Sequence, residues 1–196
     1  TSLVSGFLKS PNSEVQKAAV TSLINIGTEE AMLPLAGMLK SGNAESVALA
    51  QNALNSYSGD MSYTLASVFE ESDNDGKIAA LQLMSNRKMD SQYNLVYNQM
   101  FSDNEVVKAE AANTLKDVAS ADNIDDLFNL LGQSDSQYVP AIQTAINSVL
   151  SSMTQAEQMK VVAEKMISTD KKHLYYPALA NSQSAEAMEA LIGAYN

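Results

Sequence analysis

The stretch from Val15 to Gly27 decides the fold of this chain, and it reads Val-Gln-Lys-Ala-Ala-Val-Thr-Ser-Leu-Ile-Asn-Ile-Gly. Apolar or small side chains stand at offsets 0, 3, 4, 7, 8 and 11 from Val15. At about 100° per residue, these offsets fall within one arc of an α-helix. The stretch therefore predicts an amphipathic helix with one buried stripe.

The same pattern returns along the chain at a nearly constant interval. The residues at offset 8 are Leu23, Leu54, Met84, Leu115, Ile146 and Leu179, separated by 31, 30, 31, 31 and 33 residues. A shorter apolar segment precedes each copy, and its last strong apolar residue is Leu8, Leu39, Phe69, Met100, Leu131 or Met166. Two independent markers with one period indicate an internal repeat.

A short polar turn separates the two apolar segments of every copy. The turns are Ser10-Pro11-Asn12, Ser41-Gly42-Asn43, Ser72-Asp73-Asn74, Ser102-Asp103-Asn104, Ser134-Asp135-Ser136 and Ser168-Thr169-Asp170. Ser, Asn and Asp end one helix and cap the next, because their side chains accept hydrogen bonds from free backbone N–H groups. Capping boxes are predicted at Ser13 with Gln16 and at Thr154 with Glu157.

Each copy is therefore predicted to consist of a first helix, a tight turn, a second helix and a short link. The predicted units span residues 1–27, 28–58, 59–88, 89–119, 120–152 and 153–182, with a partial unit at 183–196.

The repeat resembles the short bacterial HEAT repeat, the kind also found in phycobilisome lyase-like proteins. The second helix of that family reads Val-x-x-Ala-Ala-x-x-small-Leu-x-x-Ile-Gly, which residues 15–27 match at nearly every position, and Pro34 resembles a proline often seen in the first helix. The resemblance covers essentially the whole chain. It implies an all-α, right-handed α-solenoid of about six stacked antiparallel helix pairs plus a terminal helix. Two copies depart from it, with Gly76 and Lys171 at the Val position, and Pro177 predicts a shortened last helix.

Neither end of the chain carries the polar capping repeat that a solenoid needs. Residues 184–196 are predicted to form a lone first helix with Met188, Leu191, Ile192 and Tyr195 on one face. We therefore expect a piece of a longer array, or ends that meet another domain or associate end to end with another subunit.

Composition excludes several classes of protein. The chain of 196 residues has no Cys, no Trp, one His and a net charge of −11. Cysteine-ligated zinc, iron–sulfur clusters and paired-His metal sites are therefore excluded within it, and no cofactor is expected. The negative charge disfavours nucleic acid, and no segment approaches the ~18 apolar residues of a membrane span. A single Arg and abundant Ser and Asn favour a bacterial periplasmic or secreted protein.

One turn follows the spacing of an EF-hand calcium loop. Residues 71–82 place oxygen ligands at Glu71, Asp73 and Asp75, with Gly76 at position six. Position twelve is Gln82, which cannot supply the bidentate carboxylate of such loops, and the repeat register begins a helix near Gly76. An acidic turn with capping residues is the favoured interpretation, and a calcium-stabilised repeat is the alternative.

Residues suited to catalysis are few. The acid pairs Glu29-Glu30 and Asp125-Asp126 are predicted in the first turns of helices, where negative charge favourably meets the helix dipole. His173 has no second His and no Cys to orient it. The chain is therefore expected not to be an enzyme.

The side of the second helices opposite the buried stripe is the candidate binding face. Offsets 6 and 9 place there Thr21, Ile24, Asn52, Asn55, Gln82, Ser85, Asn113, Lys116, Thr144 and Asn147. In the family that the repeat resembles, this side lines the concave surface. A neutral ladder of this kind could hydrogen-bond an extended peptide, another domain of the same protein or a glycan, although the missing Trp disfavours a glycan. An ordinary solvated face is the alternative.

We therefore expect a non-catalytic protein-interaction scaffold or spacer module of a larger protein, which binds its partner through the face of the second helices. The alternative is an accessory repeat arm attached to the catalytic domain of a secreted carbohydrate-active enzyme, because arrays similar to this one are found on such enzymes.

Overall fold

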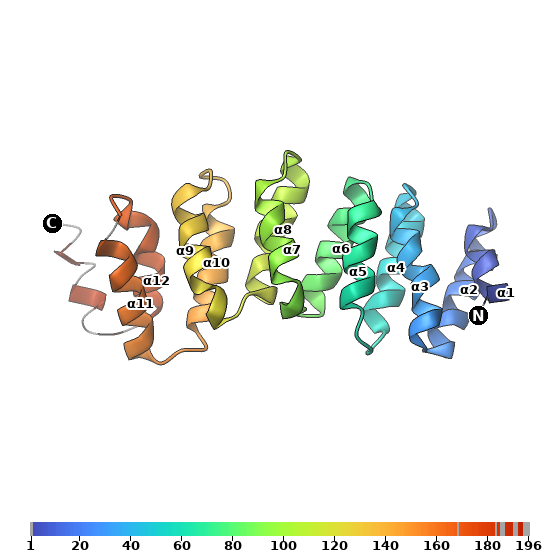
Figure 1. Cartoon of the computed structure of the whole chain (residues 1–196), viewed down its shortest axis with the longest axis horizontal. Helices are drawn as coiled ribbons and strands as arrows, with labels where there is room; N and C mark the ends of the chain where they lie inside the picture. Colours follow the sequence, from blue (N-terminus) through green and yellow to red (C-terminus); the bar gives the residue numbers. More distant parts are fainter. Residues whose placement is uncertain (1, 168, 183, 185–186, 190–191, 194–196) are drawn as a thin grey trace. The chain divides into compact units, whose positions relative to one another are not determined.

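The computed structural model describes residues 2–167, 169–182, 184, 187–189 and 192–193 (Figure 1). These residues form helices and turns and contain no strand, so the predicted all-α class is confirmed. Contacts divide the chain into two compact units, unit 1 at residues 1–114 and unit 2 at residues 115–196. The division falls inside the continuous helix α8 (Glu105–Val118).

Unit 1 contains the predicted alternation of first and second helices. The first helices are short and often end as 3-10 helix. In chain order the elements are α1 (Ser2–Ser5), η1 (Gly6–Lys9), α2 (Ser13–Ile26), α3 (Glu29–Gly37), η2 (Met38–Lys40), α4 (Ala44–Ser56), α5 (Ser62–Glu71), α6 (Asn74–Asn86), η3 (Asp90–Gln92), α7 (Tyr93–Asn98), η4 (Gln99–Phe101) and the start of α8.

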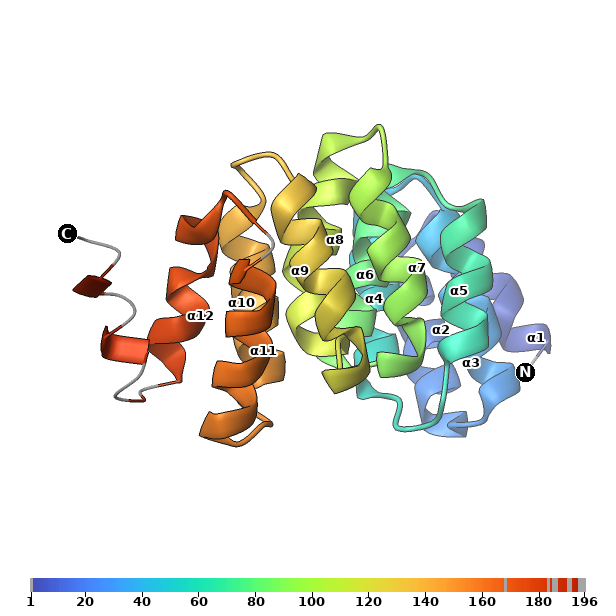
Figure 2. The ribbon, with the colours of Figure 1, turned by 60° about the vertical axis from the view of Figure 1, so that its left-hand side comes forward.

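The helices of unit 1 pack in two layers. The second helix α2 packs on α4, and α4 packs on α6, while α3 packs on α5 in the layer of first helices (Figure 2). Leu23, Leu54 and Met84, at offset 8, are fully buried between the layers. Burying a side chain of this size stabilises the fold by about 1.5–3 kcal/mol relative to leaving it exposed. The predicted buried stripe is therefore confirmed at this position in each pair.

Unit 2 contains two further helix pairs. Its elements after α8 are η5 (Ala121–Asn123), α9 (Ile124–Gln133), α10 (Val139–Leu150), α11 (Gln155–Ile167), η6 (Lys172–Tyr175) and α12 (Tyr176–Asn181). Helix α10 packs on both α9 and α12, and α11 packs on α12. Lys165 of α11 pairs with Asp125 of α9 at 2.8 Å, and Tyr175 stacks on Phe128 with ring centroids 5.3 Å apart.

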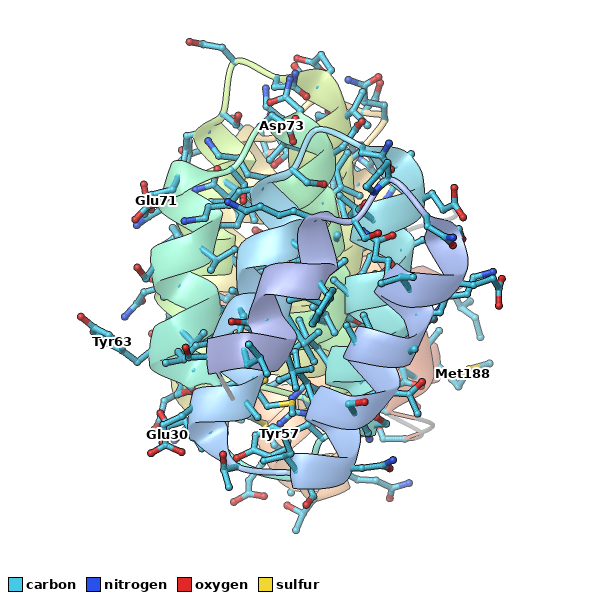
Figure 3. All side chains as sticks on the ribbon, turned by 90° about the vertical axis from the view of Figure 1, so that its right-hand side faces the viewer. Glu30, Tyr57, Tyr63, Glu71, Asp73 and Met188 are labelled. Atoms are coloured by element: carbon cyan, nitrogen blue, oxygen red, sulfur yellow. The ribbon has the colours of Figure 1, made fainter. Side chains whose placement is uncertain are left out.

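The Ser-x-Asn turns of unit 1 end one helix and cap the next, as predicted. The Oγ atoms of Ser10, Ser41 and Ser102 each accept a hydrogen bond, at 3.2 Å, from the backbone N–H of the Asn two residues later. That Asn then caps the second helix. In the third copy Asp73 takes over this role, because its Oδ1 accepts from the backbone N–H of Gly76 at 2.9 Å. The turns lie at one end of unit 1, near Glu71 and Asp73, and the links lie at the other, near Glu30 and Tyr57 (Figure 3).

One predicted capping box is wrong and the other is confirmed. The cap of α2 is Asn12 rather than Ser13. The side chain of Gln16 instead donates to the backbone oxygen of Leu8 in η1 at 2.7 Å and to Ser46 Oγ of α4 at 3.2 Å, because both elements pack against α2. At α11 the backbone N–H of Thr154 donates to Glu157 Oε2 at 2.8 Å, and the backbone N–H of Glu157 donates to Thr154 Oγ1 at 3.4 Å.

The last second helix is shortened, as Pro177 predicts. It consists of the 3-10 segment η6 and six residues of α12, and Pro177 occupies the start of α12, where its missing N–H costs nothing. Of the predicted apolar face on the terminal helix, Leu191 and Tyr195 lie outside the described residues. Met188 and Ile192 are more than half exposed.

Candidate interaction surface

None of the ten residues predicted for the binding face is buried. Thr21, Asn52, Asn55, Asn113, Lys116 and Thr144 are exposed, and Ile24, Gln82, Ser85 and Asn147 are half-buried. Unit 1 brings the members on α2, α4 and α6 together, because these three helices are neighbours in one layer. We call Thr21, Ile24, Asn52, Asn55, Gln82 and Ser85 the neutral surface.

The helices that carry the neutral surface are free of charge over most of their length. Residues 18–26 of α2, 48–56 of α4 and 78–86 of α6 contain no ionisable side chain, although the chain has 23 Asp and Glu. Two of the flanking cations have partners of their own: Lys17 pairs with Glu14 at 3.3 Å, and Arg87 donates to backbone oxygens. The six residues of the neutral surface therefore offer a partner hydrogen-bonding groups and no formal charge.

Hydrogen bonds within the neutral surface divide its amides into two kinds. Gln51 Nε2 donates to Gln82 Oε1 at 2.7 Å, which holds the Gln82 side chain between α4 and α6. Asn52 and Asn55 are exposed on the same side of α4, and within the part of the chain that the structure describes their side chains make no hydrogen bond. Their donors and acceptors are therefore available to a partner.

Three of the predicted members, Lys116, Thr144 and Asn147, lie in unit 2. The side-chain hydroxyl of Thr144 donates to the backbone oxygen of Pro140 at 2.8 Å, inside its own helix. Ser148 Oγ of α10 donates to the backbone oxygen of Lys116 at 2.9 Å. Among the described residues, the buried Oδ1 atom of Asn147 has no hydrogen-bond partner. The neutral surface belongs to unit 1 and does not include them.

The four residues of the candidate calcium loop are not arranged as one coordination shell. Glu71 pairs with Lys40 at 2.6 Å, and Asp73 caps α6. Because α6 begins at Asn74, Asp75 lies in its first turn and Gln82 lies two turns further along. Within the described ranges, no group of three or more His, Cys, Asp or Glu side chains could hold a metal ion.

The acid pairs lie where the sequence places them. Glu29 and Glu30 occupy the first turn of α3, and Asp125 and Asp126 occupy the first turn of α9; all four are exposed. His173 is exposed in η6. A groove of about 740 Å³ opens between η1 and η2 in unit 1, and Lys9 is its one ionisable lining residue. None of these acids lines it, so the groove offers no carboxylate pair for acid–base chemistry.

Comparisons with known proteins name no family. No protein-family profile and no curated protein matches the chain. The chain is similar to an engineered protein of known crystal structure, with a TM-score of 0.45 and 18% identity over 92% of this chain and 95% of that one. Similarity at this level carries no argument about function. No helix of the described segments is long and apolar enough to cross a membrane.

Sequence reasoning missed two features of this surface. The first is the extent of the neutrality: beyond the predicted ladder positions, residues 18–26, 48–56 and 78–86 carry no charge at all, which the sequence shows once the helices are aligned by repeat. The second is the role of Gln51. It stands at offset 5 of its helix, which belongs neither to the buried offsets nor to the offsets of the candidate binding face. Only the neighbouring helix α6 shows that this amide joins adjacent repeats.

Proposed function

We propose that the chain is a non-catalytic interaction scaffold that binds an extended polypeptide through the neutral surface of unit 1. The observation that carries this proposal is the charge-free run on α2, α4 and α6 in a chain of net charge −11. Exposed side chains are ordinarily rich in charge, so three adjacent helices with charge-free runs of nine residues suit contact with a neutral, hydrogen-bonding partner. An extended peptide presents such groups, because its backbone N–H and C=O are unpaired.

We further propose that both units belong to one right-handed HEAT-like solenoid. Two observations support this architecture: the offset-8 marker keeps its interval of 31 residues from Met84 to Leu115, and α8 continues through the division between the units. Small-angle X-ray scattering tests it, because a single solenoid gives an elongated pair-distance distribution with one maximum and a long tail. Two separated peaks, or a compact sphere, would contradict it.

The binding proposal is tested by selecting peptides from a random twelve-residue display library on the full chain. The affinity of each selected peptide is then measured for a variant that combines Asn52→Asp, Asn55→Asp and Ser85→Asp. Each Asn→Asp change keeps the shape of the side chain, removes its donors and adds a charge. We expect affinity to fall by about tenfold for each substitution that removes a used hydrogen bond.

A matched control variant adds the same three charges to first helices of unit 1. It combines Ser67→Asp, Asn94→Asp and Asn98→Asp, all at exposed positions on α5 and α7. We expect this variant to bind the peptides as tightly as the unaltered chain and to keep the same helical circular dichroism. The proposal fails if the library yields no binder, or if both variants bind every selected peptide equally well.

A further inference from the structure

A groove separates the first two helix pairs of unit 1, which stand side by side (Figure 1). Residues of α1, η1 and α2 form one wall, and residues of α3, η2 and α4 form the other. The volume of about 740 Å³ is within the range of small-molecule sites. The lining is rich in hydroxyl groups, which come from Ser2, Ser5, Ser10, Ser41 and Ser46. Both walls belong to this chain, so the groove is a property of the junction between the two pairs.

The next junction, between the second and third pairs, is closed at the same place. A Cβ atom at Gly76 of α6 would lie 2.2 Å from the backbone oxygen of Leu39, so α6 packs directly on η2. The corresponding residues one repeat earlier are Ser46 and Leu8. The side chain of Gln16 lies between them, because its Nε2 atom donates to the backbone oxygen of Leu8 at 2.7 Å and to Ser46 Oγ at 3.2 Å. This amide keeps α4 away from η1, and the groove stays open beside it.

The charges at the two junctions also differ. The residue directly before the turn serine is Lys9, Lys40 and Glu71 in the first three pairs. Lys40 Nζ pairs with Glu71 Oε2 at 2.6 Å across the second junction. At the first junction both positions are lysine, and within the described part of the chain Lys9 has no ion pair. The groove therefore has a cation, Lys9, and no carboxylate among its lining residues.

Two hydroxyl groups of the groove keep a hydrogen to donate. Ser10 Oγ accepts a hydrogen bond from the backbone N–H of Asn12, and Ser46 Oγ accepts one from Gln16, each at 3.2 Å. A hydroxyl also donates one hydrogen bond, and neither hydroxyl donates to an acceptor among the described residues. Ser46 lies in the first turn of α4, where the helix dipole favours negative charge. The groove therefore offers a ligand one ammonium and two hydroxyl donors.

We propose that the groove binds a small organic acid, whose carboxylate pairs with Lys9 Nζ and accepts hydrogen bonds from the serine hydroxyls. A carboxylate is the expected group because Glu71 supplies one to the equivalent lysine, Lys40, one repeat later. Charge-assisted hydrogen bonds of this kind are stronger than neutral ones. Glu45, in the first turn of α4, does not line the groove and accepts a hydrogen bond from the hydroxyl of Ser13 at 3.3 Å. The groove shares no residue with the neutral surface, so this proposal does not depend on peptide binding.

Titration of the isotope-labelled full chain with glutarate, followed by NMR, tests the proposal. We expect saturable shifts of the backbone N–H signals of Ser10, Ser41 and Ser46. Lys9→Gln should weaken glutarate binding at least about tenfold, because it removes a charge-assisted hydrogen bond. The matched control, Lys88→Gln, removes the same charge at an exposed residue outside the groove and should leave the affinity unchanged. The absence of saturable shifts in the unaltered chain, or equal affinities of the two variants, would overturn the proposal.

Filling the groove distinguishes a pocket from a single exposed lysine. A Cβ atom at Gly37, which lines the groove, meets nothing within 4 Å, so the side chain of Gly37→Leu enters the groove without moving α3. We expect this variant to lose glutarate binding although Lys9 is intact, with unchanged helical circular dichroism. Gly132→Leu, at an equally open position on α9, is the control and should bind as the unaltered chain does. Binding retained by Gly37→Leu would show that the groove is not the site.

Two further ligands test which group is recognised. Glutaramide resembles glutarate in shape but carries no charge, so it should bind at least about tenfold more weakly. Inorganic phosphate should also bind more weakly, because one lysine does not offset the cost of removing a more highly charged anion from water. Equal affinity for glutaramide would overturn the role of Lys9, and equal affinity for phosphate would overturn the assignment of a carboxylate.

Discussion

The guanidinium of Arg87 donates a hydrogen bond from Nη1 to the backbone oxygen of Leu54 at 3.1 Å, across one repeat. It also donates to the backbone oxygens of Tyr57 and Gly59. These oxygens lie in or just after the last turn of α4, where carbonyls lack the N–H partner four residues later that an inner helical residue has. The Arg87 side chain therefore supplies hydrogen-bond donors to the C-terminal end of α4, the second helix of the preceding repeat. The planar guanidinium can do this because it presents several donors in a fixed arrangement, which the ammonium of lysine lacks.

Arg87→Met should lower the free energy of unfolding by about 2–3 kcal/mol, because carbonyls that accept charge-assisted hydrogen bonds lose them. Arg87→Lys should restore only part of this loss, since one ammonium cannot reach all three oxygens. Urea denaturation followed by circular dichroism measures both. Lys88→Met, at the exposed neighbouring residue, is the control and should change stability by less than about 0.5 kcal/mol. An equal effect of Arg87→Met and the control would show that the contacts contribute nothing.

Gly76→Ala should destabilise the chain by at least about 2 kcal/mol. A Cβ atom at Gly76 would lie 2.2 Å from the backbone oxygen of Leu39, so α6 and η2 would have to move apart. Gly37→Ala is the control, because a Cβ there meets nothing within 4 Å. It should stabilise the chain by about 0.5–1 kcal/mol through helix propensity. Thermal melts of the two variants should therefore shift in opposite directions, and a shared direction would contradict the packing.

Asn104→Ala should cost about 1 kcal/mol, because the Asn104 side chain accepts hydrogen bonds from the backbone N–H groups of Val106 and Val107 at 3.1 and 3.0 Å. Asn104→Asp should retain most of the cap. The control, Asn94→Ala, lies at an exposed position of α7 and should be neutral or slightly stabilising. Denaturant midpoints compare the three variants. A loss no larger than that of the control would show that Asn104 is not the effective cap.

Tyr175 should make the stability of unit 2 sensitive to alkaline pH. Burial against Phe128 raises the pKa of the Tyr175 phenol, an effect that the nearby charge of Lys165 opposes. A raised folded-state pKa contributes stability that is fully present below the unfolded value of about 10 and is lost as pH rises through the folded value. Unfolding free energies above about pH 10 should therefore fall more steeply for the unaltered chain than for Tyr175→Phe. Tyr63→Phe, at a residue that is 87% exposed, should keep the unaltered pH dependence.

Calcium should leave the melting temperature unchanged. Glu71 is engaged by Lys40 and Asp73 by the start of α6, so binding would have to break an ion pair and a helix cap. Differential scanning calorimetry with millimolar calcium and with chelator makes the comparison. An increase with calcium that Asp75→Asn removes would instead support the loop, because a ligand that binds the folded state stabilises it.

Local chemistry explains which features of the candidate surface were predictable. Helix pairs, their period and the Ser-x-Asn turns follow from side chains close in sequence, and so did the exposed positions of Asn52 and Asn55. The capping box at Ser13 and Gln16 was predicted wrongly because Asn12 caps the helix, and the Gln16 side chain donates instead to the backbone oxygen of Leu8 and to Ser46, thirty residues away. The roles of Gln51 and Arg87 were missed for the same reason, since both bond to a neighbouring helix.

The sequence by itself determined the helices, because periodic burial, propensity and capping act within a few turns of one chain segment. Tertiary structure decided which neighbouring element contacts each side of a helix. Gly76 breaks the repeat pattern, and only the approach of Leu39 shows why a side chain is excluded there. Ser22 and Leu83 occupy the same offset, yet one is exposed and the other buried, since a preceding helix covers only the second. Whether a neighbouring helix buries a given side chain depends on how the helices pack, and the pattern within one helix does not encode it.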